Sequence, residues 1–328
     1  MPKRLLLKTL LLGLTTSCLS ISGLASAQNF PDRPITIVVP VPPGGLVDAS
    51  ARLLSEPLGR VTGQSIIIDN RQGASGNIAY QFVARSKPDG YTLLASYSGY
   101  HAANPLLMDK LTWDPFKDFT PIALLTVATN VIAVHPSVPV NNLKEFIAYA
   151  KANPGKLTVA VSSIASINHF MGELLKHKAG ITWTEVHYRG NAPAINDLIA
   201  GHVDMGLQQL SDSLQHIQSG KLRALAVLGP KRAAPLPDVP TIGEAGYPDV
   251  QGITFNGIFA PKATPQPVID KLSAAIRAAL EKKATIDQLA ALGSEARGNT
   301  PQEFRAFLEQ ETRKWSDVMK QANIKVTE

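Results

Sequence analysis

Short β-branched runs alternate with amphipathic helical patterns along most of this chain, and this alternation constrains its fold more than any other feature. We expect strands at residues 35–39, 65–69, 91–96, 157–162, 183–188, 203–207, 222–228 and 253–260. Several of these runs are continuously apolar, which is typical of strands covered by helices on both faces. The pattern predicts an α/β fold with parallel strands.

The first 27 residues have the order of a secretory signal peptide. Lys3, Arg4 and Lys8 precede an apolar stretch, which ends in Ala-Ser-Ala. We therefore expect export to the periplasm, with cleavage after Ala27. Lipidation of Cys18 is the alternative, but the preceding Thr-Thr-Ser matches lipoprotein processing poorly, so we favour a cysteine discarded with the signal.

Loss of that segment changes what the composition implies. Cys18 is the only cysteine, so the mature chain has no disulfide, thiol nucleophile or cysteine-based metal site. The formal charge of +6 falls to +3, because the three basic residues of the segment leave and no acid does. The remaining basic residues are scattered, which argues against a nucleic-acid partner.

Two stretches interrupt the alternation and suggest that the chain crosses twice between two lobes. The run FTPIALLTVATNVIAVHPSVPV is unusually long for one strand, and a long Pro- and Gly-rich connection begins at Pro230. A mature length of 301 residues also exceeds what one core usually organises. We predict lobes of residues 28–127 with 253–328, and of residues 128–252.

Two helices have distinct N-terminal signals. The sequences NLKE, from Asn142, and TPQE, from Thr300, both match the capping-box pattern and precede apolar stripes. These are scaffold features and carry no information about a ligand.

The loop VPVPPGGLVD follows the first expected strand and opens a helical pattern. Its two glycines, Gly44 and Gly45, lack the residues that a phosphate loop or a dinucleotide fingerprint requires. The start of a helix nevertheless offers free backbone N–H groups that can hold an anion without a charged side chain. We expect Asp48 to cap or complement this helix rather than to contact a ligand.

Three further loops of small or polar residues follow other expected strands. They are the loop of Gly73, Ala74, Ser75 and Gly76, the segment ASYSGYH, and the segment VSSIASINHF. Ligands of open α/β sheets bind at the strand ends. Four such loops, drawn from two lobes, predict one shared cleft.

Catalysis is poorly supported by the sequence. It contains no Gly-x-Ser-x-Gly elbow, and Ser, His and Asp residues alone do not indicate a triad. His169, Glu173 and His177 are spaced by four residues, but the pattern differs from His-Glu-x-x-His. We expect structural roles for them, and we expect no enzyme activity, metal or cofactor.

The chain resembles a known family in an ordered series of segments. These include FPDRPITIVVPVPPGGLVDASAR, DNRQGASGNIAYQFVARSKPDGYTLL, HYRGNAPAINDLIAGHVDMG and GKLRALAVLGPKRAAPLPDVPTIGEAGYP. They resemble the solute receptors of tripartite tricarboxylate transporters, called Bug-type receptors. The resemblance implies a two-lobed periplasmic binding protein fold with a hinge, a carboxylate ligand in the interlobe cleft, and docking on a separate two-subunit membrane permease. A monomer is the default for such a receptor.

The resemblance also implies site residues. Ligand contacts are expected at Pro43, Gly44, Gly45, Leu46, Val47, Ala74, Ser75, Gly76, Ser96, Ser98, Ser166, Asn168 and Gln208, and rim contacts at Tyr97, Tyr100, His101 and Arg189.

Two departures from the family pattern bear on the ligand. Leu46 and Val47 stand where many relatives place a Thr or Ser before the Asp, so a hydroxyl donor is missing. Gln208 stands near a position where relatives place an acid that could pair with a ligand amine. With Tyr97 and Tyr100 able to cover a ring, the sequence favours an aromatic or apolar mono- or dicarboxylate over citrate or an amino acid.

Two other functions remain open from the sequence. A receptor that presents its ligand to a membrane sensor kinase needs the same cleft. Deletion of the gene would stop uptake if the chain serves transport, and would stop only induction if it serves signalling. An exported hydrolase needs an assembled nucleophile and base, and would show turnover that disappears in a Ser75 or Ser166 alanine variant.

Overall fold

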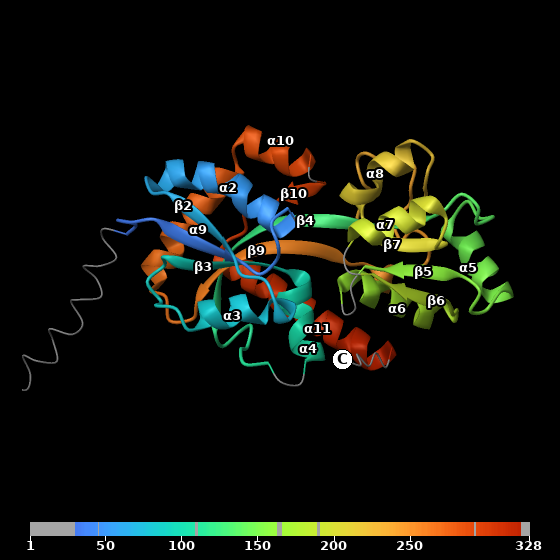
Figure 1. Cartoon of the computed structure of the whole chain (residues 1–328), viewed down its shortest axis with the longest axis horizontal. Coiled ribbons are helices and arrows are strands. Elements are labelled where there is room, and N and C mark those ends of the chain that lie inside the picture. The colour runs from blue at the N-terminus through green and yellow to red at the C-terminus, as the bar shows by residue number, and fades with distance from the viewer. Residues whose placement is uncertain are drawn as a thin grey trace, which may run out of the picture.

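The computed structural model describes residues 30–44, 46–108, 111–162, 166–188, 191–291 and 293–322. The expected signal peptide, residues 1–27, lies outside the described residues. None of the described helices is both long enough and apolar enough to cross a membrane. The described chain forms an α/β fold that is elongated along one axis (Figure 1).

All eight expected strands form, with ends shifted by at most two residues. The strands are β1 (Ile35–Val39), β2 (Ile66–Asn70), β3 (Thr92–Tyr97), β4 (Phe119–Val134), β5 (Thr158–Val161), β6 (Thr184–His187), β7 (Met205–Gln209), β8 (Arg223–Val227), β9 (Ile253–Pro261) and β10 (Ser294–Ala296).

Helices separate most of these strands. They are α2 (Leu46–Thr62), α3 (Asn77–Ala84), α4 (Asn104–Leu107), α5 (Leu143–Ala152), α6 (Ile167–Ala179), α7 (Asn191–Ala200), α8 (Leu210–Gln218), α9 (Gln266–Leu280), α10 (Lys283–Ala291) and α11 (Pro301–Ala322), with short turns η1 (Ala74–Gly76), η2 (Gly99–Ala103) and η3 (Pro248–Val250). Both capping boxes form, because the Asn142 and Thr300 side chains accept the N–H groups of Glu145 and Glu303.

Strand β4 connects two halves of the molecule. The run that is unusually long for one strand is a single strand of 16 residues. Its residues 119–129 pair with β9, its residues 130–134 pair with β7, and its residues 131–134 pair with β8. We call β1–β3, β9 and β10 with α2–α4, α9 and α10 the first half, and β5–β8 with α5–α8 the second half.

The sheet is mixed rather than uniformly parallel. Its order is β2-β1-β3-β9-β4-β7-β5-β6, and β8 and β10 also pair with β4. Parallel pairs lie toward the two edges, between β1 and its neighbours and between β5 and its neighbours. The pairs of β4 and β9 are antiparallel, because these two strands carry the chain between the halves in opposite directions.

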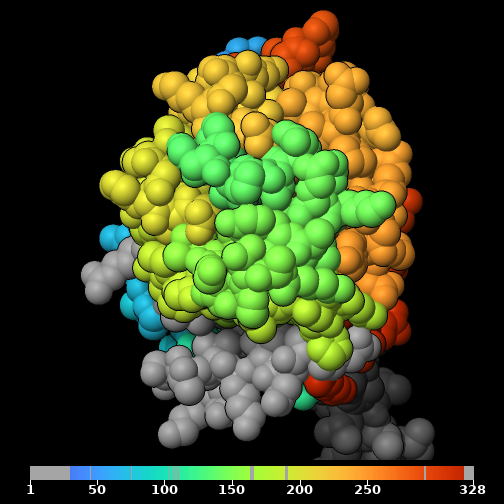
Figure 2. Space-filling model, turned by 90° about the vertical axis from the view of Figure 1, so that its right-hand side faces the viewer, coloured from blue at the N-terminus to red at the C-terminus, as the bar shows by residue number. Residues whose placement is uncertain are grey.

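Each half has its own buried layers. In the first half, α2 and α9 pack on one face of the sheet, and α3 packs on the other with the start of α11. In the second half, α5 and α6 cover one face and α7 the other. Figure 2 looks onto the end formed by the second half, whose green to orange segments make up that surface.

The C-terminal helix α11 packs on both halves. Phe304 and Leu308, near its start, are buried in the first half. Trp315 and Val318, near its end, are buried with the core of the second half, and the Trp315 ring lies 6.1 Å from that of Phe170. Figure 1 shows α11 running beneath both halves toward α6.

Candidate ligand-binding cleft

A cleft of about 1160 Å³ lies between the two halves. The loop before α2 and the loop after β3 form its first wall, and the starts of α6, α7 and α8 form its second wall. The middle of β9 contributes Thr254 and Asn256 between the walls. The cleft therefore draws on both halves and on a strand that joins them.

The loop before α2 is held in place by Asp48. One carboxylate oxygen of Asp48 accepts the Gly44 N–H at 2.9 Å, and the other accepts the Asn70 amide at 2.8 Å. The Arg52 guanidinium donates to both oxygens, at 3.1 and 2.9 Å. Burial favours the neutral acid, but the hydrogen bonds from Arg52, Gly44 and Asn70 outweigh it and lower the pKa of Asp48. Asp48 is thus an ionised anchor for the loop.

Leu46 and Val47 line the cleft directly after this loop. Val47 is the buried member of the pair. Both lie in the first turn of α2, where backbone N–H groups have no partner within the helix. This end of the cleft therefore combines N–H donors with apolar side chains.

Two tyrosines form the next part of the first wall. The rings of Tyr97 and Tyr100 line the cleft with their centroids 4.7 Å apart. Desolvation raises the pKa of both phenols, so they are neutral. Between them, Ser98 lines the cleft and its buried hydroxyl has no hydrogen-bond partner among the described residues.

Tyr100 also packs against the loop before α3. A Cβ atom at Gly76 would lie 2.4 Å from the Tyr100 ring, and the φ of Gly76 is +85°. Only glycine accommodates both conditions without strain. Ala74 is exposed in the same loop, and neither Ala74 nor Gly76 is among the described lining residues of the cleft.

Ser96 and His101 lie beneath the first wall rather than in it. Successive side chains of a strand point to opposite faces, so Ser96 points away from the face that Tyr97 occupies. It is hydrogen-bonded to the buried Tyr80 hydroxyl, which lies 3.4 Å from His101 Nδ1. Burial lowers the pKa of His101 to about 3, so its imidazole is neutral.

In the second wall, three helices begin at the cleft. Ser166 caps α6 by accepting the His169 N–H at 3.2 Å, and its hydroxyl hydrogen is left to donate. The Asn168 amide donates to the Leu207 carbonyl at 3.0 Å, and its buried Oδ1 has no partner among the described residues. Asn191 opens α7 and Gln209 precedes α8. The N-termini of three helices, each with a positive partial charge, thus lie at this wall.

The floor of the cleft contains a buried polar cluster that sequence reasoning missed. The Asn256 amide donates to Thr126 at 3.1 Å, and Asn130 lies 3.4 Å from the Thr254 hydroxyl. The Oδ1 atoms of Asn130 and Asn256 have no partner within the described chain. Alternating polar residues at 254 and 256, in an otherwise apolar strand, are the signal that could have found this cluster.

The remaining expected residues are placed as follows. Pro43 is exposed in the turn before α2. Gln208 is fully buried on β7, and its neighbour Gln209 lines the cleft instead. Gly45, Arg189 and the side chain of Ser75 lie outside the part of the chain that the structure describes.

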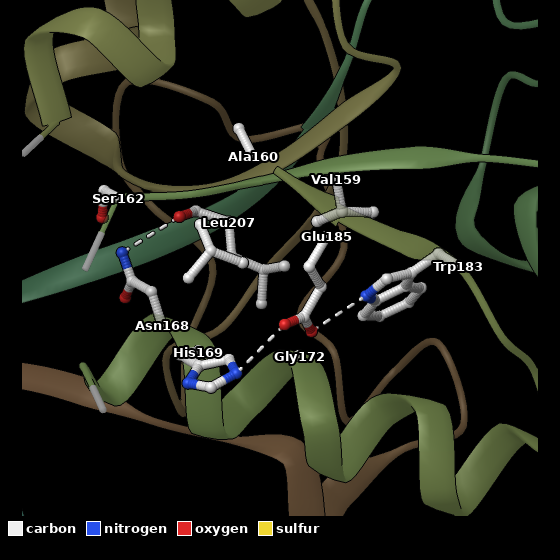
Figure 3. Close-up of a pocket in the computed structure, with 10 residues that line it drawn as sticks. Val159, Ala160, Ser162, Asn168, His169, Gly172, Trp183, Glu185 and Leu207 are labelled. Atoms are coloured by element: carbon white, nitrogen blue, oxygen red, sulfur yellow. Dashed lines mark hydrogen bonds and ion pairs between the residues drawn. The ribbon is translucent and has the colours of Figure 1, made fainter. Parts of the chain in front are cut away.

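A second cavity of about 10 Å³, large enough for about one water molecule, lies beside the cleft and shares Ser162 and Asn168 with it (Figure 3). His169 Nε2 lies 3.3 Å from a Glu185 oxygen, and Trp183 donates to the other oxygen at 3.4 Å. Glu173 lies in the same group. One side-chain atom able to coordinate a metal ion from each of His169, Glu173 and Glu185 lies within 4.8 Å of the others.

Lys176 explains how these carboxylates coexist. Its ammonium contacts Glu173 and lies 3.1 Å from Glu185. Burial and the neighbouring carboxylate raise the pKa of Glu173. For Glu185, the hydrogen bonds from His169 and Glu173 and the positive charges of His169 and Lys176 together outweigh burial and lower its pKa. The two carboxylates already have a cation, and the cluster is an ion-pair network that ties α6 to β6.

The cleft can bind an anion without a cationic side chain. No Lys or Arg is among its described lining residues. Neutral hydroxyls, amides and helix N-termini line the cleft instead, and each can donate a modest hydrogen bond to an anion.

Comparison with known proteins agrees with this architecture. Residues 50–324 match the family model described as tripartite tricarboxylate transporter family receptor. Protein BugT of Bordetella pertussis is 34% identical over 316 residues, covering 96% of this chain and 97% of BugT.

Two solved structures from Rhodopseudomonas palustris are also similar. Rpa4515 with adipate is 37% identical, with a TM-score of 0.81 over 90% of this chain and 99% of that one. MatC with bound malate is 34% identical, with a TM-score of 0.77 over 88% and 99%. The matched region and these similarities show that the chain belongs to the tripartite tricarboxylate transporter receptors, the Bug-type periplasmic solute-binding proteins.

Proposed function

We propose that this chain captures a small organic carboxylate with an apolar or aromatic body for a tripartite tricarboxylate-type transporter. The observation that carries the proposal is the cleft, where neutral donors from both halves adjoin apolar and aromatic side chains. The adipate of Rpa4515 and the malate of MatC support a carboxylate ligand.

The ligand's carboxylate is assigned to the start of α2. Because Asp48 already accepts the Gly44 N–H, the N–H groups of Leu46 and Val47, in the first turn of α2, are the donors that we assign to the ligand. The dipole of α2 favours an anion at the same point. Ser75 and Gly76, in the neighbouring loop, are retained as proposed contacts.

The body of the ligand is assigned to the apolar part of the cleft. Leu46 and Val47 line one wall together with the Tyr97 and Tyr100 rings, and Ile195 lines the other. Citrate would place three carboxylates in a cleft whose described lining contains no Lys or Arg. A mono- or dicarboxylate with an apolar stretch fits this chemistry better.

Closure of the two halves completes the site. A volume of about 1160 Å³ exceeds the range of about 300–1,000 Å³ that is usual for small-molecule sites. Bending of β4 and β9 would bring Ser166 and Asn168 toward a ligand held by α2. We keep lobe boundaries of 28–127 with 253–328 and of 128–252, and the exchange of partners after residue 129 of β4 supports them.

The cellular setting follows from the family and remains a proposal for this chain. We propose export through the N-terminal segment, cleavage after Ala27 and a monomer in the periplasm. The closed, loaded form would dock on a two-subunit permease, which would use the ion gradient.

A thermal-shift panel of mono-, di- and tricarboxylates tests this function. A true ligand at 100 times its Kd stabilises the folded chain by about 2.7 kcal/mol, which raises Tm by several degrees. We expect at least one carboxylate with an apolar or aromatic body to do so. If no carboxylate raises Tm at millimolar concentration, the proposed function is wrong.

A further inference from the structure

Asp212 is chemically unlike the rest of the cleft. It is the one carboxylate among the described lining residues, in a site otherwise built from groups that suit an anion. A ligand anion beside it would be repelled. This residue therefore constrains which part of a ligand can lie near α8.

The hydrogen bonds of Asp212 leave it open toward the cleft. Its Oδ2 accepts from the Asn191 amide at 2.9 Å, and its Oδ1 accepts from the Ser211 hydroxyl at 3.2 Å. Each carboxylate oxygen has a further acceptor position. No Lys, Arg or His of the described chain lies within ion-pair distance of it, and its side chain is exposed.

The groups packed around Asp212 do not neutralise it. Its position in the first turn of α8 favours the ionised form. Partial desolvation against α7 acts in the opposite direction and raises its pKa, despite the hydrogen bonds from Asn191 and Ser211. The carboxylate therefore gains from any further donor that reaches it.

The first turn of α8 also lies against the first half of the molecule. A Cβ atom added to Gly293 would lie 2.3 Å from the Ser211 Cβ. The two halves are thus already in contact beside Asp212, at this end of the cleft.

We propose that Asp212, oriented by Asn191, is a specificity-determining acceptor for a hydroxyl or ammonium group at the end of the ligand opposite its carboxylate. This inference rests on the proposed function and narrows it. The ligand class becomes a carboxylate with an apolar or aromatic body and a terminal hydrogen-bond donor. Both kinds of donor satisfy Asp212 by the same chemistry, and the probes below distinguish them.

The experiment compares matched probes by titration calorimetry. The aliphatic set is hexanoate, 6-hydroxyhexanoate and 6-aminohexanoate, and the aromatic set is benzoate, 4-hydroxybenzoate and 4-(aminomethyl)benzoate. Each is titrated into the wild type, Asp212→Asn and Asp238→Asn. Asp238 is an exposed acid of the second half that is not among the cleft-lining residues, so its variant controls for the loss of one charge.

We expect the wild type and Asp238→Asn to bind a donor-bearing probe at least about 10-fold more tightly than its unsubstituted partner. In Asp212→Asn that preference should fall by at least about 10-fold, while affinity for the unsubstituted partner stays the same or improves. Equal binding of donor-bearing and unsubstituted probes by the wild type overturns the inference, as does a preference that survives in Asp212→Asn.

The proposed function can survive that failure. Carboxylates that bind without a donor preference leave the receptor function intact and remove only the role of Asp212. If neither these six probes nor the wider carboxylate panel binds, the function and the inference fail together.

Discussion

At the scale of single residues, Asp48 links the sequence to the shape of the site. Its carboxylate is 3% exposed and accepts hydrogen bonds from Gly44, Arg52 and Asn70. These bonds fix the turn before α2 and leave the helix start facing the cleft. The sequence predicts this capping role, because a short acid in the first turn complements the N-terminus of a helix.

The Asp48→Asn variant should lose about 1–2 kcal/mol of unfolding free energy at pH 7, because Gly44 and the half-exposed Arg52 lose their charged partner. The pKa of Asp48 is lowered in the folded state, so its contribution is complete above the ordinary value of about 3.9. That contribution is lost as the pH falls through the folded pKa. Urea titrations from pH 7 to pH 3 measure both effects.

Glu56→Gln provides the control for this titration. Glu56 pairs with Arg60 on the exposed face of the same helix, so its variant should change stability by less than about 0.5 kcal/mol. The difference between the wild type and Asp48→Asn should shrink below pH 4. A difference that stays constant down to pH 3 would show that Asp48 does not hold the loop through its charge.

Some site residues could be predicted from the sequence and others could not. Leu46, Val47, Ser98 and Ser166 line the cleft because they follow strand ends or open helices, which local patterns reveal. Ser96 precedes the cleft-lining Tyr97 on β3, so its side chain points to the opposite, buried face of the sheet. Asp212 becomes a neighbour of the cleft only through tertiary packing, so local patterns could not identify it, whereas the alternating polar residues at 254 and 256 could have indicated Asn256.

At the scale of elements, the strands were predictable and their pairing was not. Short β-branched or apolar runs locate eight strands, but the three-residue β10 has no such signal. Nor does the sequence show that one strand, β4, serves both halves. A hydrophobic run indicates that a strand is buried but does not show which strands pair with it. The change of pairing strands along β4 depends on the path of the whole chain.

Helix α11 ties the halves together through Trp315. This ring is fully buried in the core of the second half, and its Nε1 donates to Glu311 at 3.0 Å. Trp315→Ala should reduce the free energy of unfolding by about 3–5 kcal/mol, because it leaves a large cavity. Urea unfolding followed by circular dichroism measures the loss.

The exposed Arg313 of the same helix supplies the matched comparison. Arg313→Ala should stay within about 0.5 kcal/mol of the wild type. A Trp315→Ala loss below about 1 kcal/mol would mean that the end of α11 does not bind the second half tightly in solution.

At the scale of the whole molecule, backbone N–H groups at helix starts and buried amide oxygens without partners among the described residues lie at one cleft. The starts of α2, α6, α7 and α8 face it, and unpartnered amide oxygens lie along its floor. A site of this kind can attract an anion through many weak donors. We propose that the halves close around the ligand and that the apolar and acidic side chains of the cleft determine selectivity.

The most direct test is titration calorimetry with the carboxylate that raises Tm most, using the wild type, Ala192→Trp and Ala200→Trp. Ala192 lines the cleft at the start of α7, whereas Ala200 is exposed at the other end of that helix. The account predicts one site per chain, retained in Ala200→Trp and lost in Ala192→Trp. Absence of binding heat, or unchanged binding in Ala192→Trp, would contradict it.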